Sequence, residues 1–217
     1  MTAFDDRQVA GRLLATALAP LRGADVVVLG LPRGGVPVAF EVARALGAEL
    51  DVIVVRKLGL PFQPEVAMGA IGEGGERVLD HDLVRRAQVT AAQLQTVEQR
   101  ERQVLNARVA QLRRDREPVS LRGRTAVVVD DGIATGSTAR AACEIARRLG
   151  AARVVMAAPV APARTTASGL AADDLVCLAM PAAFRAVGEF YRDFAPITDD
   201  EVITLLDAEF GTEPSGF

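Results

Sequence analysis

The chain has 217 residues and a net charge of −3, and 50% of its residues are hydrophobic while only 4% are aromatic. This length suits one α/β domain with at most a modest insertion, and the hydrophobic content excludes global disorder. The weak negative charge gives no support to nucleic acid or an anionic membrane as the main partner.

The first third of the chain alternates between strand-like apolar runs and helix-like spacing. The elements predicted there are a helix over 6–19 with Asp5 or Asp6 as N-cap, a strand over 26–29, a loop over 30–35, a helix over 36–46 that Gly47 ends, and a strand over 50–55. The next segment, 61–75, holds two prolines and four glycines. We expect a mobile loop there, since both residue types disfavour regular structure.

The pattern changes near residue 82. From 82 to 116, apolar residues recur at helical intervals among many charges, which predicts one long amphipathic helix or a helical hairpin. The elements predicted after it are a strand over 125–129, a helix over 138–149, a strand over 153–160, a short helix over 164–171, a strand over 175–180 and a helix over 199–210. Apolar strands that alternate with helices indicate an α/β fold, with a mainly parallel sheet and helices on both faces.

The two cysteines and the N-terminal segment bear on the compartment. Cys143 and Cys177 lie in apolar stretches without metal-ligand spacing, so we expect buried free thiols in a reducing environment. Residues 1–14 carry acids where a signal peptide would carry basic residues. No apolar run approaches the roughly 20 residues that a membrane span needs. These features predict a soluble cytoplasmic protein.

The segment 125–138 is the strongest candidate site. A strand over 125–129 runs into Asp130 and Asp131, then into a loop with two glycines and three hydroxyl side chains, and then into a helix. Ligands of parallel sheets bind at the carboxyl ends of strands, and a glycine-rich turn at a helix N-terminus suits a phosphate. The two acids would repel a phosphate but can accept hydrogen bonds from sugar hydroxyls or help to hold magnesium.

Other phosphate motifs do not fit this segment. No lysine precedes Ser137 as a P-loop requires, and the GxGxxG spacing of dinucleotide sites is absent. The alternative interpretation is an ordinary glycine-rich turn, with Asp130 and Asp131 solvated at a strand end.

The run VVVDDGIATGST over 127–138 resembles the binding motif for phosphoribosyl pyrophosphate in type I phosphoribosyltransferases. The resemblance implies their three-layer α/β fold, in a single domain over 1–217 with a helical insertion over about 80–118 and a small C-terminal hood over about 181–197. It also implies that Asp130 and Asp131 bind the ribose hydroxyls and, with the substrate, Mg²⁺. The residues expected to hold the 5-phosphate are Ala134, Thr135, Gly136, Ser137 and Thr138.

A second glycine-containing loop follows the first strand. In Leu31–Gly35 the glycines allow close backbone approach, and Arg33 offers forked donors to a polyanion. The family resemblance assigns pyrophosphate to Arg33, Gly34 and Gly35. It also implies a non-proline cis peptide, at the Pro32–Arg33 or the Arg33–Gly34 bond. The alternative is an ordinary turn with an exposed arginine.

Lys57 is the only lysine among 25 basic residues. All the other basic residues are arginines, so the one retained lysine suggests a position that requires a compact ammonium group. Chance retention under biased codon usage is the alternative explanation. The pair Arg56 and Lys57 resembles the pair before the flexible catalytic loop of adenine and orotate phosphoribosyltransferases. Both are therefore expected to stabilise the leaving pyrophosphate catalytically. A surface pair at a strand end is the alternative.

The segment after the last predicted core strand resembles the base-binding segment of hypoxanthine-guanine phosphoribosyltransferases. The resemblance implies that Phe184, which matches the aromatic residue that stacks on the purine, and Val187 contact the acceptor base. Phe190, Tyr191 and Phe194 suit base contact or a small satellite core equally well.

Two features depart from the purine enzymes. Ala134 stands where the hypoxanthine-guanine enzymes carry an acid, so no side-chain proton acceptor is identified. The 82–116 segment has no counterpart in the small enzymes, and we expect a solvated or oligomer-contacting helix there. His81, the only histidine, is interpreted as a surface or capping residue.

The sequence therefore predicts a phosphoribosyltransferase that uses phosphoribosyl pyrophosphate, Mg²⁺ and an unknown nitrogenous base. The alternatives are a non-catalytic regulator that senses the donor or a nucleotide, and a hydrolase of phosphorylated sugars or nucleotides. The cations expected near pyrophosphate favour transfer over sensing, and no positioned water or evident base supports hydrolysis.

Overall fold

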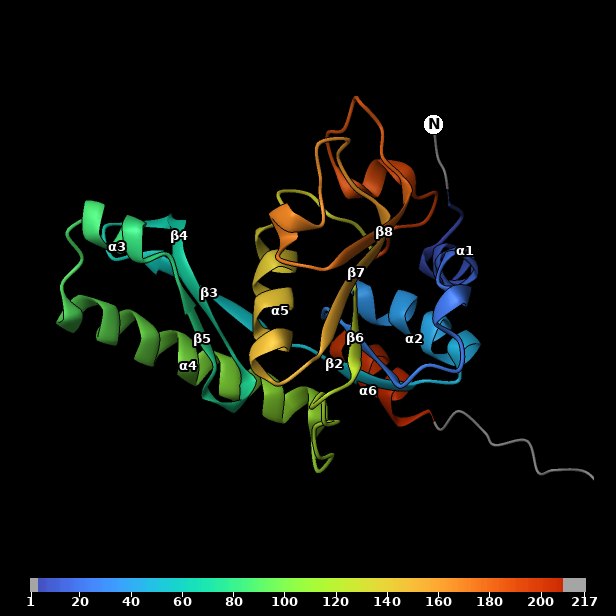
Figure 1. The fold of residues 1–217 in the computed structure, drawn as a ribbon, viewed down its shortest axis with the longest axis horizontal. Coiled ribbons are helices and arrows are strands. Elements are labelled where there is room, and N and C mark those ends of the chain that lie inside the picture. The colour runs from blue at the N-terminus through green and yellow to red at the C-terminus, as the bar shows by residue number, and fades with distance from the viewer. Residues whose placement is uncertain (1–3, 209–217) are drawn as a thin grey trace, which may run out of the picture.

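The computed structural model describes residues 4–208. Its main sheet has five parallel strands in the order β2-β1-β6-β7-β8 (Figure 1). Their bounds are β1 Val26–Gly30, β2 Glu49–Val52, β6 Thr125–Val129, β7 Arg153–Val160 and β8 Asp174–Ala179. The α/β fold class with a parallel sheet is confirmed, and the predicted bounds of β6 and β7 match the structure.

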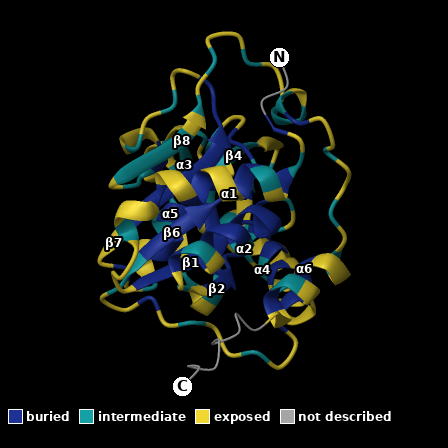
Figure 2. Cartoon of the chain, turned by 90° about the vertical axis from the view of Figure 1, so that its right-hand side faces the viewer, coloured by how far each residue is buried: buried dark blue, intermediate teal, exposed yellow. Residues whose placement is uncertain are grey.

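Helices cover both faces of this sheet, so the body has three layers (Figure 1). Alternate residues of β1 show the division: Val26 and Val28 pack with α1 and α2, whereas Val27 and Leu29 pack with α5. Figure 2 shows the inner strands of the sheet as its buried centre, whereas the edge strand β8 is only half-buried. The bounds of these helices are α1 Arg7–Ala17, α2 Gly35–Leu46 and α5 Ser137–Arg148, and α6 Asp199–Asp207 packs beside α2.

The side of the sheet to which the next strand is added changes between β1 and β6, although the two strands run parallel. From β1 the chain crosses through α2 to β2 on one side, and from β6 it crosses through α5 to β7 on the other. The register pairs Gly30 with Val129, so the two strands end side by side. Such a switch point opens a crevice at the carboxyl ends of the strands, where α/β proteins bind ligands.

A second sheet forms a lobe beside the body, and its presence corrects two predictions. The strands β3 Val55–Leu60, β4 Gln63–Gly72 and β5 Arg77–Leu79 pair antiparallel. The predicted strand over 50–55 is therefore split between two sheets. The mobile loop predicted over 61–75 is wrong, because most of it is β4.

The glycines in β4 explain the wrong prediction. Gly69 does not break the strand but allows close packing, since a Cβ there would lie 2.3 Å from the carbonyl oxygen of Val78. The prolines lie at and beside the two-residue turn between Leu60 and Gln63. Glycine in a strand can mark close backbone approach as well as a loop.

The helical part of the lobe is two helices, α3 His81–Arg86 and α4 Ala91–Arg113. The buried residues Val97, Leu105 and Leu112 join α4 to the main core, so this helix is not merely solvated. We use "the lobe" below for residues 55–113.

The other elements are short or differ slightly from prediction. The helix predicted over 164–171 is only a 3₁₀ turn at Ser168–Leu170, and residues 209 and 210 of the last predicted helix lie outside the described residues. The remaining 3₁₀ turns are Ala19–Leu21, Glu73–Gly75 and Val187–Phe190.

Among residues 4–208, no helix combines the length and apolar character of a membrane span.

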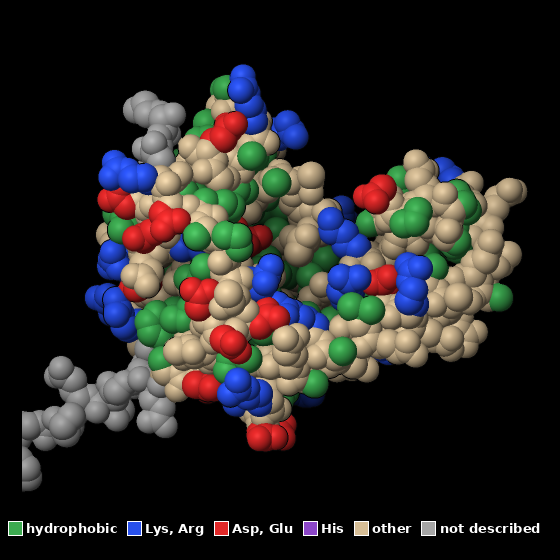
Figure 3. Space-filling view, turned by 180° about the vertical axis from the view of Figure 1, so that it is seen from behind, with side chains coloured by type: hydrophobic (Ala, Val, Ile, Leu, Met, Phe, Trp, Pro, Cys, Tyr) green, Lys and Arg blue, Asp and Glu red, His purple; other side chains and the backbone are tan. Residues whose placement is uncertain are grey.

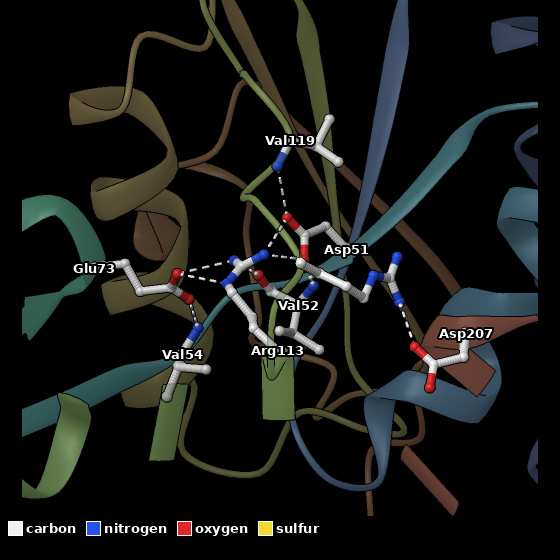
Figure 4. A network of polar contacts seen from close by, with 8 residues as sticks. Asp51, Val52, Val54, Glu73, Arg113, Val119 and Asp207 are labelled. Atoms are coloured by element: carbon white, nitrogen blue, oxygen red, sulfur yellow. Dashed lines mark hydrogen bonds and ion pairs between the residues drawn. The ribbon is translucent and has the colours of Figure 1, made fainter. Parts of the chain in front are cut away.

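A buried ion-pair network ties the lobe to the main sheet (Figure 4). Arg113, at the end of α4, donates to the Asp51 carboxylate of β2 (2.6 Å to Oδ2) and to Glu73 Oε2 at 2.9 Å. Asp51 also accepts the backbone N–H of Val119 at 2.9 Å. Burial raises the pKa of Glu73, while Arg113 opposes that rise. Arg113 thus neutralises a buried carboxylate, Asp51, and a half-buried one, Glu73, from different parts of the chain.

We expect Arg113→Met to lower the free energy of unfolding by about 3–5 kcal/mol, because it leaves the buried Asp51 and the half-buried Glu73 without a cation. Chemical denaturation measures this loss. Arg114→Gln, at the next and exposed position, is the control and should change stability by less than about 0.5 kcal/mol. Equal effects of the two substitutions would contradict this account of the network.

Candidate functional site

Two loops meet where β1 and β6 end side by side. The backbone N–H of Leu31 donates to the carbonyl of Val129 at 2.8 Å. Gly34 lies so close to Asp131 that a Cβ on it would be 1.9 Å from Asp131 Oδ2. Only glycine fits this contact. The peptide bond Pro32–Arg33 is cis, at one of the two bonds predicted.

The two helices that begin at this edge lack capping side chains. Asp6, Asp80, Thr90 and Thr198 cap α1, α3, α4 and α6, whereas α2 and α5 have no side-chain cap. The first backbone N–H groups of a helix need acceptors, and the helix dipole makes that end electropositive. At α2 the N–H groups of Gly35 and Val36 already donate to the carbonyls of Leu31 and Arg33, so this end offers an anion mainly its positive dipole. The start of α5 suits an anionic ligand with several oxygens more directly.

The 132–138 loop presents donors at the start of α5. Gly136 has a left-handed φ of 78°, which glycine adopts without strain, and it is the residue before the helix. The hydroxyls of Thr135 and Ser137 lie 3.1 Å apart. Ala134 and Thr138 are exposed beside them. The residues predicted for the 5-phosphate thus form one contiguous turn.

The two acids lie between these loops and are both half-buried. Asp130 Oδ1 accepts the backbone N–H of Asp131 at 2.9 Å, and Asp131 Oδ2 accepts Nε of Arg7 at 2.8 Å. Burial and the charge of Asp131 raise the pKa of Asp130 well above its ordinary value. Burial also raises the pKa of Asp131, and Arg7 opposes that rise. The pair carries more negative charge than its protein neighbours balance.

This donor set fits magnesium held jointly with a substrate. No group of three or more histidine, cysteine or acidic side chains among residues 4–208 could enclose a metal ion. Mg²⁺ usually takes one or two carboxylates together with substrate phosphates and water, rather than an all-protein cage. Asp130 and Asp131 could supply those carboxylates, and the cation would reduce their mutual repulsion.

Arg56 and Lys57 lie on β3 with opposite orientations, because successive side chains of a strand point to opposite faces. Arg56 donates to Glu101 of α4 at 2.6 and 3.0 Å. Lys57 instead lines a cavity of about 530 Å³ between the lobe and α5. The structure therefore does not bring these two predicted catalytic residues together on one surface.

The cavity that contains Lys57 extends to the start of α5. Ser137 and Arg140 line it from α5, and His81 lines it from α3. His81 was expected as a surface or capping residue, and it is exposed. Figure 3, seen from behind, shows Lys and Arg side chains gathered where the lobe meets the body, around a hollow between them.

Arg33 is exposed in the 31–35 loop, as its predicted role requires. A hydrogen bond from Arg108 is the main cause that lowers the pKa of Asp199 on α6, and the charge of Arg33 contributes. Arg33 therefore lies within electrostatic reach of Asp199 on α6. The structure brings Gly34 and Gly35 to the acids: a Cβ on Gly35 would lie 2.9 Å from Asp130 Cα, as one on Gly34 would lie close to Asp131.

The predicted acceptor segment lies beside the 132–138 loop. Val187 packs on Gly132, where a Cβ would come within 2.4 Å of Val187 Cγ1. Phe184 stacks on Phe190 with ring centroids 5.6 Å apart. These rings join Tyr191 and Phe194 in a small cluster with Phe4. The satellite core, one of the two alternatives for Phe190, Tyr191 and Phe194, is thus present. It also includes Phe184, which was expected to contact the base.

Sequence reasoning missed two residues that contact the acids, Arg7 and Tyr191. Arg7 is one of 24 arginines, and it contacts Asp131, which lies 124 positions away in the sequence. The hydroxyl of Tyr191 donates to the carbonyl oxygen of Asp131 at 2.6 Å. No local pattern marks either contact, because both depend on the folded arrangement of the N-terminus and the C-terminal segment.

Comparisons with known proteins place these observations in context. The family model of the phosphoribosyl transferase domain matches residues 5–188. Two proteins of Mycobacterium tuberculosis, from strains CDC 1551 and H37Rv, have names that propose a phosphoribosyl transferase. Each is 57% identical over 208 residues, which cover 95% of this chain and 47% of the relative. This chain thus spans about half the length of these curated relatives.

A solved structure matches the fold over nearly its whole length. The crystal structure of TT1426 from Thermus thermophilus superposes with a TM-score of 0.86 at 48% identity. The match covers 95% of this chain and 98% of that one. The lobe and the body therefore belong to an architecture that another protein shares.

We expect Gly34→Ala to displace the Asp131 carboxylate, to lower the free energy of unfolding by about 1–3 kcal/mol through overpacking, and to weaken the binding of inorganic pyrophosphate. Denaturation and calorimetry measure the two effects. Gly169→Ala is a matched control, since its Cβ would meet only the Thr166 hydroxyl at 3.1 Å. If both variants bound pyrophosphate as the unsubstituted protein does, the contact between Gly34 and Asp131 would have no part in anion binding.

Proposed function

This chain belongs to the phosphoribosyl transferase domain family, and on that premise we propose that it transfers 5-phosphoribose from phosphoribosyl pyrophosphate to a nitrogen of a base. Pyrophosphate is the leaving group. The observation that carries the proposal is the switch point itself, where the starts of α2 and α5, neither with a side-chain cap, flank Asp130 and Asp131. Two electropositive helix starts beside a pair of acids match a ligand that has phosphate groups at both ends and a sugar diol between them.

In this proposal each end of the donor has its own helix start. The start of α5, with the turn Ala134–Thr138, holds the 5-phosphate, and the start of α2, with Arg33, Gly34 and Gly35, holds the pyrophosphate. Asp130 and Asp131 accept hydrogen bonds from the ribose hydroxyls. The short distance between the two loops supports this division, because Gly34 touches Asp131.

The charge that develops on departing pyrophosphate requires cations. Lys57 lines a cavity that reaches the 5-phosphate turn at Ser137, so we assign its ammonium the stabilisation of negative charge on the bound donor. Arg56 would contribute only after it leaves Glu101 of α4. Magnesium, when bound with the donor, supplies further neutralisation of the pyrophosphate charge.

The acceptor is proposed to lie beside the hood, which is defined here as residues 181–197. Val187 packs on Gly132 of the phosphate turn, and Phe184 lies in the adjoining aromatic cluster. A flat heterocycle placed there would contact apolar surface close to the ribose. We also propose a reducing, cytoplasmic setting, which the free thiols of Cys143 and Cys177 support.

A donor-sensing regulator is the second candidate, and one observation favours it. The ion pair between Arg56 and Glu101 occupies one of the two cations expected to stabilise the leaving group. A sensor needs the helix starts that bind the phosphates, but it does not need cations that stabilise a leaving pyrophosphate. Turnover therefore separates the two functions.

The test combines the protein with Mg²⁺, phosphoribosyl pyrophosphate and a panel of purine and pyrimidine bases. We expect pyrophosphate release that depends on a base and on Mg²⁺. Lys57→Ala should lower the rate by about 10²–10³-fold, as loss of a charge-stabilising group does. Arg85→Gln is the control, because Arg85 is exposed on α3 and pairs with Asp82 of the same helix.

The other possible outcomes of this test would support a different function. Tight donor binding without turnover supports the sensor, and pyrophosphate release without a base supports a hydrolase. No binding of the donor at all would refute every function that depends on this crevice.

A further inference from the structure

Arg7 is a buried cation that contacts three parts of the site at once. It begins α1, and only 8% of the residue is exposed. Its Nε donates to Asp131 Oδ2 at 2.8 Å, and its Nη1 donates to the carbonyl oxygen of Ala195 in the hood at 2.8 Å. The guanidinium carbon lies 3.9 Å from the ring centroid of Phe194. One planar group thus joins α1, the acidic motif and the hood.

Tyr191 makes a second link between the hood and the same acid. Its hydroxyl donates to the carbonyl oxygen of Asp131 at 2.6 Å, and its ring packs on Phe4 and Phe194 with centroids 5.4 and 5.1 Å apart. Tyr191 is buried. The side chain of Asp131 is therefore bonded to Arg7, which also bonds the hood, and its backbone carbonyl is bonded to Tyr191 of the hood itself.

The contact with Arg7 leaves Asp131 available to a ligand. An ionised carboxylate offers about four lone-pair positions on two oxygens, and Arg7 uses one oxygen. The guanidinium is rigid and forked, so a change in the position of Asp131 changes the direction of Nη1 toward Ala195. A lysine has a single nitrogen and cannot keep this fixed geometry.

We propose that Arg7 is a positioning residue that couples the hood to the acidic motif, so that binding of the phosphoribosyl donor at Asp131 orders the acceptor side. This inference rests on the proposed function for the identity of the donor. Tyr191 is the second contact of the same coupling. The donor site and the acceptor site are then linked in free energy, and each ligand strengthens the other.

The test uses the full chain, Mg²⁺ and phosphoribosyl pyrophosphate, and needs no acceptor. Calorimetry gives the donor affinity, and hydrogen exchange of the amides in 184–195 gives the order of the hood. Tyrosine fluorescence gives an independent signal, because Tyr191 is the only tyrosine and the chain has no tryptophan. In the unsubstituted protein we expect the donor to slow hood exchange about 10-fold, within the usual range of couplings, and to change the fluorescence.

Arg7→Lys separates charge from geometry. It keeps a cation beside Asp131, so donor affinity should stay within about 3-fold, but the hood protection and the fluorescence change should be lost. Arg7→Gln removes the charge and should weaken donor binding about 10-fold as well. Tyr191→Phe should lose hood protection with little change in donor affinity.

Arg12→Gln is the matched control, because Arg12 is half-exposed on the same helix and pairs with Glu41 away from the site. It should behave as the unsubstituted protein. If an Arg7 variant fails to fold, as thermal unfolding would show, Tyr191→Phe still decides the question.

The outcomes distinguish this inference from the proposed function. Donor binding that leaves hood exchange and Tyr191 fluorescence unchanged overturns the coupling and leaves the proposed function intact. Hood protection that survives both Arg7→Lys and Tyr191→Phe also overturns it. Absence of donor binding in the unsubstituted protein refutes the proposed function itself, and the inference falls with it.

Discussion

The parallel pairing of β1 with β6 is the constraint on which the site depends. Because Gly30 is in register with Val129, the loops that follow the two strands start at the same height on the sheet. The helices that follow, α2 and α5, lie on opposite faces, so their uncapped starts converge on one crevice from two sides. The contact between Gly34 and Asp131 then closes the gap between the loops. A shift of one residue in this register would separate them.

The lobe depends on a different interaction, the pairing of Arg113 with Asp51 and Glu73. Burying three charges is costly unless each has partners, and here the carboxylates also accept backbone N–H groups. The network lies at the base of the lobe, where β2 leads toward β3 and where α4 ends. It therefore fixes the strand that carries Lys57 relative to α5.

Much of the body was predictable because its signals are local. Apolar runs identified the core strands, Gly47 marked the end of α2, and the acidic motif identified the crevice. The lobe was not predictable in the same way. Gly69 reads as a loop signal in the sequence, but it is a close-packing position in β4. The separation of Arg56 from Lys57 also escaped prediction, because it follows from β3 being a strand at these residues. Arg7 meets Asp131 only through tertiary structure.

The single lysine has a practical consequence for chemistry on this protein. Its side-chain amine is the only one in the sequence, and it lines the cavity between the lobe and α5. An amine-selective acylating reagent would therefore have one side-chain target in this sequence. Covalent labelling followed by mass spectrometry would then report the occupancy of one defined position, without any engineered tag.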